Sequence, residues 1–161
     1  MKKTVYCGVL VALALIFSYI EVLFPLPIAV PGIKLGLANI VILFALYRMG
    51  EGYAVSISIV RVILAGVLFS NMASVMYSLA GAIAALVAMY LAKRLGLHVI
   101  TVSIIGAILH ILGQLLVAGM VTSFGAVSYY LPYLLVASLV TGALIGALGS
   151  LLIDRIPIDT Y

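Results

Sequence analysis

Residues 99–121 read VITVSIIGAILHILGQLLVAGMV, and this run of 23 residues contains no Lys, Arg, Asp or Glu. A transmembrane helix needs about 20 consecutive, mostly apolar residues, because it must cross a hydrocarbon core about 30 Å thick at a rise of about 1.5 Å per residue. The run therefore predicts a membrane-spanning helix. Its most polar side chains, His110 and Gln114, are four residues apart and so share one face of that helix.

The rest of the chain has the same apolar character. Of its 161 residues, 67% are hydrophobic and 7% are charged, and the mean hydropathy is +1.44. A soluble domain carries roughly 45–50% apolar and about 25% charged residues. The composition therefore excludes an ordinary soluble domain. We expect an all-α, polytopic protein embedded in a lipid bilayer, in which residues 1–161 form a single integral membrane domain.

Apolar runs separated by charges, Pro or Gly predict six transmembrane helices. Their expected ranges are 4–24, 34–48, 53–70, 74–92, 99–121 and 131–153. The second range is short, which leaves open a tilted, broken or incompletely spanning helix. The connections are predicted to be brief, with a turn near Ser70-Asn71 and another connection at Ser123-Phe124-Gly125. The first range exceeds the 7–15 apolar residues typical of a secretory signal, so we expect a retained helix.

The basic residues predict how the chain is oriented, because connections rich in Lys and Arg stay on the cytoplasmic side. With the N-terminus inside, the residues that fall on the inner side are Lys2, Lys3, Arg48, Lys93, Arg94 and Arg155. Lys34 falls on the outer side. The sequence thus predicts a multi-pass protein of the cell membrane with both termini in the cytoplasm.

Several classes of function are excluded by the short supply of reactive side chains. The chain has four acidic residues, two His and the single Cys7, without the spacing of a metal site. It has no GxxxxGK[ST] loop to cradle a nucleotide phosphate. Its basic residues come one or two at a time, whereas a nucleic-acid interface needs them clustered. We therefore expect no enzyme activity, no catalytic residues, no metal, no cofactor and no nucleic-acid partner.

Arg61 is the strongest candidate for a functional charge, since it lies eight residues from both Tyr53 and Phe69. An unpaired charge at the bilayer centre costs at least about 2.5–3.5 kcal/mol, so an ionisable residue there suggests function. Ser58 and Ala65 share its helix face, which indicates the interior of a helix bundle. Two compatible interpretations remain open: an ion pair with Glu21 and a contact with a ligand.

His110 and Gln114 are expected to line an interior face of the fifth helix. A hydrogen-bonding role for His110, in a cavity or between helices, is the favoured interpretation. Proton relay and metal binding remain as alternatives, although a lone His would need further ligands to hold a metal.

The segment 31–39, PGIKLGLAN, is the most distinctive part of the sequence. Pro and Gly precede a predicted helix start, where backbone N–H groups without partners carry the positive end of the helix dipole. Such a place favours an anion, and Lys34 lies beside it. Asn39 follows Gly36 by three residues and so shares its face. The alternative is a lysine that reaches the outer membrane interface and an asparagine bonded to a neighbouring helix.

The predicted topology places many polar residues in the outer half of the membrane. They are Glu21, Lys34, Asn39, Asn71, Tyr77, Gln114, Tyr129 and Tyr130, with Arg61 and His110 below them near the midplane. The inner half is apolar. A polar cluster open to one side favours a site that captures a small molecule from outside over a continuous channel.

Five segments carry a family resemblance that covers nearly the whole chain, from about residue 9 to residue 148. They are Ser18-Tyr19-Ile20-Glu21, the segment from Pro31 to Asn39, RVILAG beginning at Arg61, YSLAG beginning at Tyr77, and His110 with Gly113-Gln114. Together they resemble the bacterial Gx transporter family, which also bears the name heptaprenyl diphosphate synthase component I. That family is similar to the S components of energy-coupling-factor vitamin transporters. Those are six-helix membrane proteins that bind substrate from outside and dock on an ATP-driven module.

This resemblance implies an S-component-like bundle that acts as the substrate-capture subunit of a transporter. The substrate would be a small organic molecule, anionic or amphiphilic, and the partner an ATP-driven transmembrane coupling module. The expected binding residues are Lys34 for the anion, Glu21 and Arg61 as a charged floor, Asn39, His110 and Gln114 for hydrogen-bond selectivity, and Tyr77 for stacking.

Two other functions remain open. One is a non-catalytic membrane accessory subunit of an isoprenoid or quinone synthesis system or of a membrane redox system. Trans-prenyl synthases resemble one another in aspartate-rich motifs that hold magnesium, whereas this chain has only Asp154 and Asp159. It would therefore assist such an enzyme without catalysing the reaction. The other is a purely structural scaffold.

Overall fold

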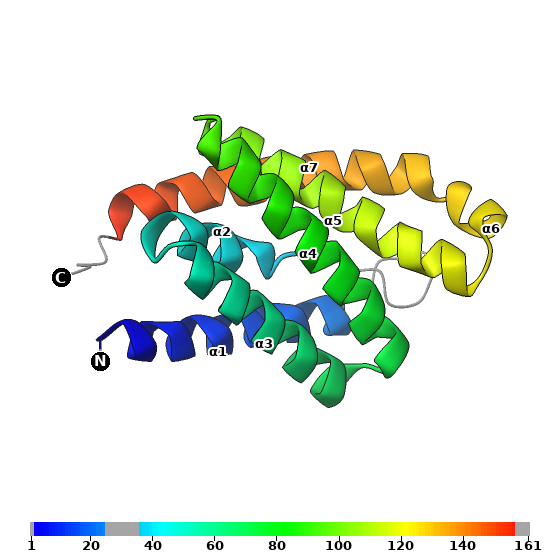
Figure 1. Cartoon of the computed structure of the whole chain (residues 1–161), viewed down its shortest axis with the longest axis horizontal. Coiled ribbons are helices and arrows are strands. Elements are labelled where there is room, and N and C mark those ends of the chain that lie inside the picture. Colours follow the sequence, from blue (N-terminus) through cyan, green and yellow to red (C-terminus); the bar gives the residue numbers. More distant parts are fainter. Residues whose placement is uncertain (1, 25–35, 157–161) are drawn as a thin grey trace.

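The structure is a computed structural model that describes residues 2–24 and 36–156, and these residues form helices joined by short connections (Figure 1). The helices are α1 (Lys2–Leu23), α2 (Asn39–Arg48), α3 (Glu51–Phe69), α4 (Met72–Arg94), α5 (Val99–Val121), α6 (Phe124–Ser128) and α7 (Leu131–Arg155). The described residues contain no strand. The predicted all-α class is therefore confirmed.

Five of these helices, α1, α3, α4, α5 and α7, are long and apolar enough to cross a membrane. The chain is therefore built as a membrane-embedded helix bundle. Helix α5 has the predicted bounds, and the other four long helices agree with their predicted ranges to within about two residues.

The predicted count of six spans is not confirmed, because the second apolar run forms a helix of only 10 residues. Helix α2 is about 15 Å long at about 1.5 Å per residue, roughly half of the hydrocarbon thickness. Residues 41–46 of α2 are all buried, and the helix packs against α1, α3 and α7. Its apolar composition thus reflects burial inside the bundle, which a short apolar run also indicates.

One of the two predicted connections has the expected form, and the other contains a short helix that was not predicted. The predicted turn near Ser70-Asn71 is present, and the Asn71 side chain accepts a hydrogen bond from the backbone N–H of Ser74 at 2.9 Å. The predicted connection at residues 123–125 instead leads into the short helix α6. A five-residue helix carries too little periodicity to be recognised in a sequence.

Small residues allow the closest helix contacts in the bundle. An added Cβ at Gly113 of α5 would lie 2.8 Å from the carbonyl oxygen of Ala80 on α4. Likewise, a Cβ at Gly142 of α7 would lie 2.8 Å from the Cα of Ile104 on α5. Contacts this close between backbones require residues without a side chain. Helices α4, α5 and α7 therefore form one closely packed layer.

The first turn of α1 and the last turn of α7 lie at the same end of the molecule, which we call the basic end (Figure 1). The basic residues of this end are Lys2, Lys3, Arg48, Lys93, Arg94 and Arg155. A hydrogen bond from Arg48 to the carbonyl oxygen of Ile153 joins α2 to α7 there. The Lys93 ammonium donates to the carbonyl oxygen of Leu46 at 2.7 Å and so joins α4 to α2. Positive side chains near helix C-termini also interact favourably with the helix dipole.

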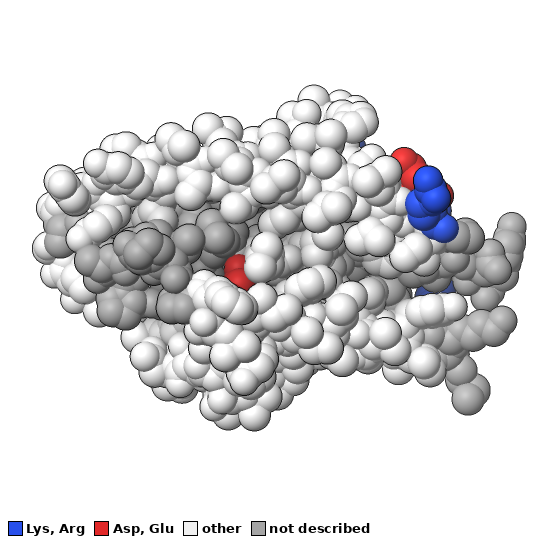
Figure 2. All heavy atoms as spheres, turned by 180° about the vertical axis from the view of Figure 1, so that it is seen from behind, with Lys and Arg blue, Asp and Glu red and all other residues white. Residues whose placement is uncertain are grey.

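Away from the basic end, charged side chains are scarce among the described residues. Figure 2 shows a face on which charged side chains gather at one end, apart from a single acidic spot near the middle of the molecule. Large apolar side chains of α1, α3, α4, α5 and α7 are exposed. An apolar belt of this kind is the surface that lipid covers in a membrane protein.

Candidate functional site

The carboxylate of Glu21, in the last turn of α1, bonds to the backbone that leads into α2. Its Oε1 accepts hydrogen bonds from the backbone N–H groups of Gly36 at 2.5 Å and Leu37 at 2.7 Å. The turn formed by residues 36–38 opens α2, since the N–H of Asn39 donates to the carbonyl oxygen of Gly36 at 2.8 Å. These are the N–H groups at which the sequence predicted an anion. The anion that they bind in this structure is the chain's own Glu21.

Arg61 lies in the middle of α3 and is only 4% exposed. Its Nη1 donates to the Ser18 hydroxyl on α1 at 3.5 Å, and its charge interacts electrostatically with that of Glu21. Nε and Nη2 have no hydrogen-bond partner among the described residues. Ser58 and Ala65 are buried on the same face, so the predicted interior face of α3 is confirmed.

His110 and Gln114 are buried near the middle of α5, with 3% and 0% of their surfaces exposed. The side-chain Nε2 of Gln114 lies 2.9 Å from the Nε2 of His110. An amide nitrogen only donates, so in this arrangement the imidazole Nε2 is the acceptor. The Oε1 of Gln114 has no hydrogen-bond partner in the described part of the chain. The predicted interior face of α5 is thus confirmed.

Gly36 lies close both to the Glu21 carboxylate and to the His110 ring. Its φ of +85° is a conformation that favours glycine, and a Cβ added there would lie 2.6 Å from the Asn39 side-chain nitrogen. The same position is 4.0 Å from the Cδ2 of His110. On the other side of His110, a Cβ at Gly81 of α4 would lie 2.6 Å from its carbonyl oxygen and 2.8 Å from the Cγ of Gln114. Helices α1, α2, α4 and α5 therefore meet around these side chains, and α3 adds Arg61.

We call this group the polar cluster. Its members are Ser18, Glu21, Gly36, Asn39, Arg61, His110 and Gln114. It thus contains five of the seven side chains that the sequence singled out for binding. A buried arginine, a carboxylate and an amide with an open oxygen can together hold a molecule that has both charged and hydrogen-bonding groups.

The other predicted binding residues lie elsewhere. Lys34 falls outside the described residues. Tyr77 of α4 is buried in an apolar cluster that includes Ile111, Leu115 and Leu134. Asn71 caps α4, and Tyr129 is 70% exposed. The prediction that Asn71 and Tyr129 share a cluster with Arg61 and His110 is not confirmed, because each lies at an exposed helix end.

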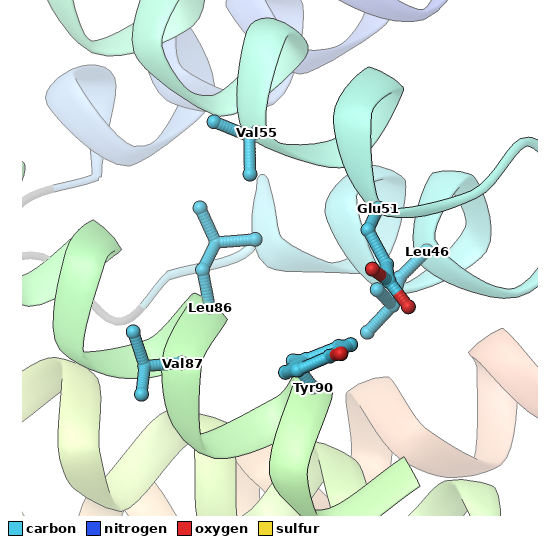
Figure 3. A pocket seen from close by; sticks show the side chains of 6 residues that line it. All are labelled: Leu46, Glu51, Val55, Leu86, Val87 and Tyr90. Atoms are coloured by element: carbon cyan, nitrogen blue, oxygen red, sulfur yellow. The ribbon is translucent and has the colours of Figure 1, made fainter. Parts of the chain in front are cut away.

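The bundle also has shallow apolar grooves. One of about 230 Å³, between the end of α2, the start of α3 and the middle of α4, is lined by Leu46, Glu51, Val55, Leu86, Val87 and Tyr90 (Figure 3). In Figure 3 the Glu51 carboxylate and the Tyr90 ring lie at one side of this groove, with apolar side chains across it. A second groove, of about 300 Å³, lies between α5, α6 and α7. Neither groove is lined by a member of the polar cluster.

Sequence reasoning did not assign Ser18 to the site and did not identify the anion that pairs with the start of α2. Ser18 bonds to Arg61, and its position three residues before Glu21 places both on one face of α1. The backbone N–H groups of Gly36 and Leu37 were expected to attract an external anion. Their pairing with Glu21 could not be inferred, because it depends on how α1 packs beside the start of α2.

Comparison with known protein families gives a match over most of the chain. The family model described as heptaprenyl diphosphate synthase component I matches residues 10–152. No curated protein and no solved structure matches the chain. The family match includes residues of all seven helices and every member of the polar cluster. The chain therefore belongs to the heptaprenyl diphosphate synthase component I family.

Proposed function

We propose that this protein is a non-catalytic membrane subunit that binds a small anionic organic molecule in the polar cluster. The molecule enters from the side of the membrane opposite the basic end. By the positive-inside rule that side is the outside of the cell, and both termini are cytoplasmic. The protein thus acts as the substrate-capture subunit of an uptake system in the cell membrane.

The buried guanidinium of Arg61 is the observation that carries this proposal. Two of its three nitrogens lack a hydrogen-bond partner among the described residues, although the side chain is almost fully buried. A charged donor in the membrane interior is costly unless it is paired, and such residues commonly mark a substrate pathway. Glu21 supplies one charge, but its Oε1 is already bonded to the start of α2. An anionic ligand would supply acceptors for the remaining donors.

Uptake against a gradient would need energy from a partner. We expect an ATP-driven coupling module, since the sequence has no phosphate-cradling GxxxxGK[ST] loop of its own. The resemblance to transporter S components supports this choice of partner.

A second candidate function follows from the family match. The family name describes one component of a prenyl diphosphate synthase, which suggests a membrane accessory protein. In that role the polar cluster would hold an isoprenoid precursor or a headgroup for a separate catalytic subunit. Both functions use an anionic ligand, and they differ in the protein that accompanies the chain.

Native mass spectrometry of the protein, purified gently from its own membrane, separates these functions. We expect a bound non-lipid molecule in the wild type that is lost in Arg61→Met, together with a copurifying ATPase module. A prenyl synthase or an electron-transfer subunit in place of the ATPase would favour the accessory role. A wild-type protein without any bound molecule, or one whose bound molecule stays in Arg61→Met, would refute a binding function of the cluster. Ser138→Ala is the matched control, because Ser138 is buried in α7 and donates only to its own helix.

A further inference from the structure

Only one of the two polar atoms of the Gln114 side-chain amide has a hydrogen-bond partner among the described residues. Its nitrogen contacts His110 at 2.9 Å, while its oxygen has no hydrogen-bond partner among the described residues. The side chain is fully buried, so bulk water does not reach it. A buried carbonyl oxygen without a partner costs free energy, and such groups in native proteins call for an explanation. A ligand that donates to this oxygen provides one.

The position of the amide relates it to Arg61. The Cδ2 atom of His110 faces Gly36, and Cδ2 is bonded to the Nε2 atom that Gln114 contacts. The amide therefore lies at the edge of the imidazole that faces the start of α2. The Glu21 carboxylate bonds to Gly36 at that same start and interacts with Arg61. Gln114 and Arg61 thus belong to one continuous group of contacts that converges on the start of α2.

Helix α4 packs against the His110 and Gln114 side chains. A Cβ at Gly81 would lie 2.8 Å from the Cγ of Gln114 and 3.1 Å from the Nδ1 of His110. The backbone of α4 therefore packs directly on these two side chains and leaves no room for a ligand there. The start of α2 lies at a different edge of the imidazole, with a Cβ at Gly36 4.0 Å from the Cδ2 of His110.

We infer that the molecule bound in the polar cluster carries an N–H or O–H donor for the Gln114 oxygen in addition to the anionic group for Arg61. This inference rests on the proposed function and narrows its substrate class. A hydroxy acid, an amino acid derivative or an acidic heterocycle with an N–H group has both features. A simple fatty acid or an unsubstituted prenyl diphosphate has the anionic group alone. A site with a buried acceptor discriminates strongly against analogues that lack the matching donor.

The test uses the full-length protein in detergent, incubated with the methanol–water extract of the cells from which it was purified. Native mass spectrometry then records bound masses for the wild type, Arg61→Met, Gln114→Met and Ser103→Ala. Ser103 is the control because it is buried on α5 but packs toward α7, where a Cβ at Gly146 would lie 2.9 Å from its own Cβ. Repeating the measurement on the released molecule in D₂O counts its exchangeable hydrogens.

We expect one bound anionic mass with at least one exchangeable hydrogen besides any on the acid. Its affinity should fall roughly tenfold to a hundredfold in Gln114→Met, the effect of one lost hydrogen bond, and more in Arg61→Met. It should be unchanged in Ser103→Ala. A molecule that is lost from Arg61→Met but retained by Gln114→Met, or that has no such hydrogen, would overturn the inference and leave the proposed function standing. If the wild type binds nothing from the extract, both are overturned. The hydrogen count needs only wild-type protein, so the test survives a Gln114→Met variant that does not fold.

Discussion

The Oε1 of Glu21 on α1 accepts a hydrogen bond of 2.7 Å from the backbone N–H of Leu37, directly before α2. This contact links two helices through a charge that is only 8% exposed. The same carboxylate interacts with Arg61 on α3. Glu21 thus joins α1 to the start of α2 by hydrogen bonds and acts electrostatically on Arg61 of α3, so its removal should weaken the contacts of α1 with both helices.

Glu21→Ala is expected to lower the free energy of unfolding by about 1–3 kcal/mol for each of the two backbone N–H groups that lose their acceptor. It leaves the Arg61 charge without its acidic neighbour and two backbone N–H groups without their acceptor. Denaturation in mixed micelles measures the change. Glu51→Gln, at the exposed start of α3, is the matched control and should stay within about 0.5 kcal/mol of wild type. Equal effects of the two substitutions would contradict a structural role of Glu21.

Gly36→Ala and Gly50→Ala separate backbone strain from crowding. Both glycines have positive φ, +85° and +101°, so each substitution should cost about 1–3 kcal/mol of strain. A Cβ at Gly36 would also lie 2.6 Å from the Asn39 side chain, whereas nothing lies within 4 Å of one at Gly50. Gly36→Ala should therefore cost roughly 2–5 kcal/mol in total, with the excess due to overpacking. Thermal unfolding of both variants measures whether Gly36→Ala is the more destabilising substitution. A larger loss of stability in Gly50→Ala would contradict the close contact between Gly36 and the Asn39 side chain.

Gly81→Ala should separate α4 from α5, because its Cβ would collide with the backbone of His110 as well as with Gln114. We expect a loss of about 1–3 kcal/mol in stability and weaker binding of the molecule held by the cluster. Gly52→Ala, in the first turn of α3, meets nothing within 4 Å and should be neutral or stabilising by up to about 1 kcal/mol. Thermal unfolding and native mass spectrometry provide the two measurements. A stable Gly81→Ala variant with wild-type binding would show that α4 does not close the cluster.

Lys93→Met should weaken the contact between α4 and α2 at the basic end. The Lys93 ammonium donates to the carbonyl oxygen of Leu46 and lies 5.1 Å from the centre of the Tyr47 ring. We expect a loss of about 1 kcal/mol, because the bond is only partly buried. The neighbouring Arg94→Met removes an exposed guanidinium stacked over Tyr90 and should cost about 0.5 kcal/mol or less. Faster hydrogen exchange at the C-terminal end of α2 in Lys93→Met alone would support the contact. Identical exchange in both variants would argue against it.

The orientation can be tested with single cysteines in a Cys7→Ser background. Ser70 and Leu97 are exposed in the α3–α4 and α4–α5 connections, respectively. A membrane-impermeant thiol reagent should label Ser70→Cys in intact cells, and Leu97→Cys only after the membrane is opened. That result follows if the basic end is cytoplasmic. The opposite pattern would place the entrance of the site on the cytoplasmic side and contradict uptake from outside.

The sequence alone determined most of the secondary structure and which helix faces are buried. Long apolar runs have no alternative to a helix within a bilayer, because every backbone polar group must be bonded internally. Polar residues on an apolar helix face inward for a related reason, since a polar side chain that faces lipid has no hydrogen-bond partner. Arg61, His110 and Gln114 can therefore be assigned to interior faces from their positions in apolar runs.

The tertiary structure decided the role of the second apolar run and the pairing within the cluster. An apolar run of about ten residues is compatible with part of a span and with a buried helix, and only the neighbours of α2 distinguish the two. The N–H groups before α2 attract any anion equally well, so composition cannot say whether the anion is a ligand or Glu21. That choice is made by the packing of α1 beside α2, a contact between residues 15 and 16 positions apart that leaves no trace in local periodicity.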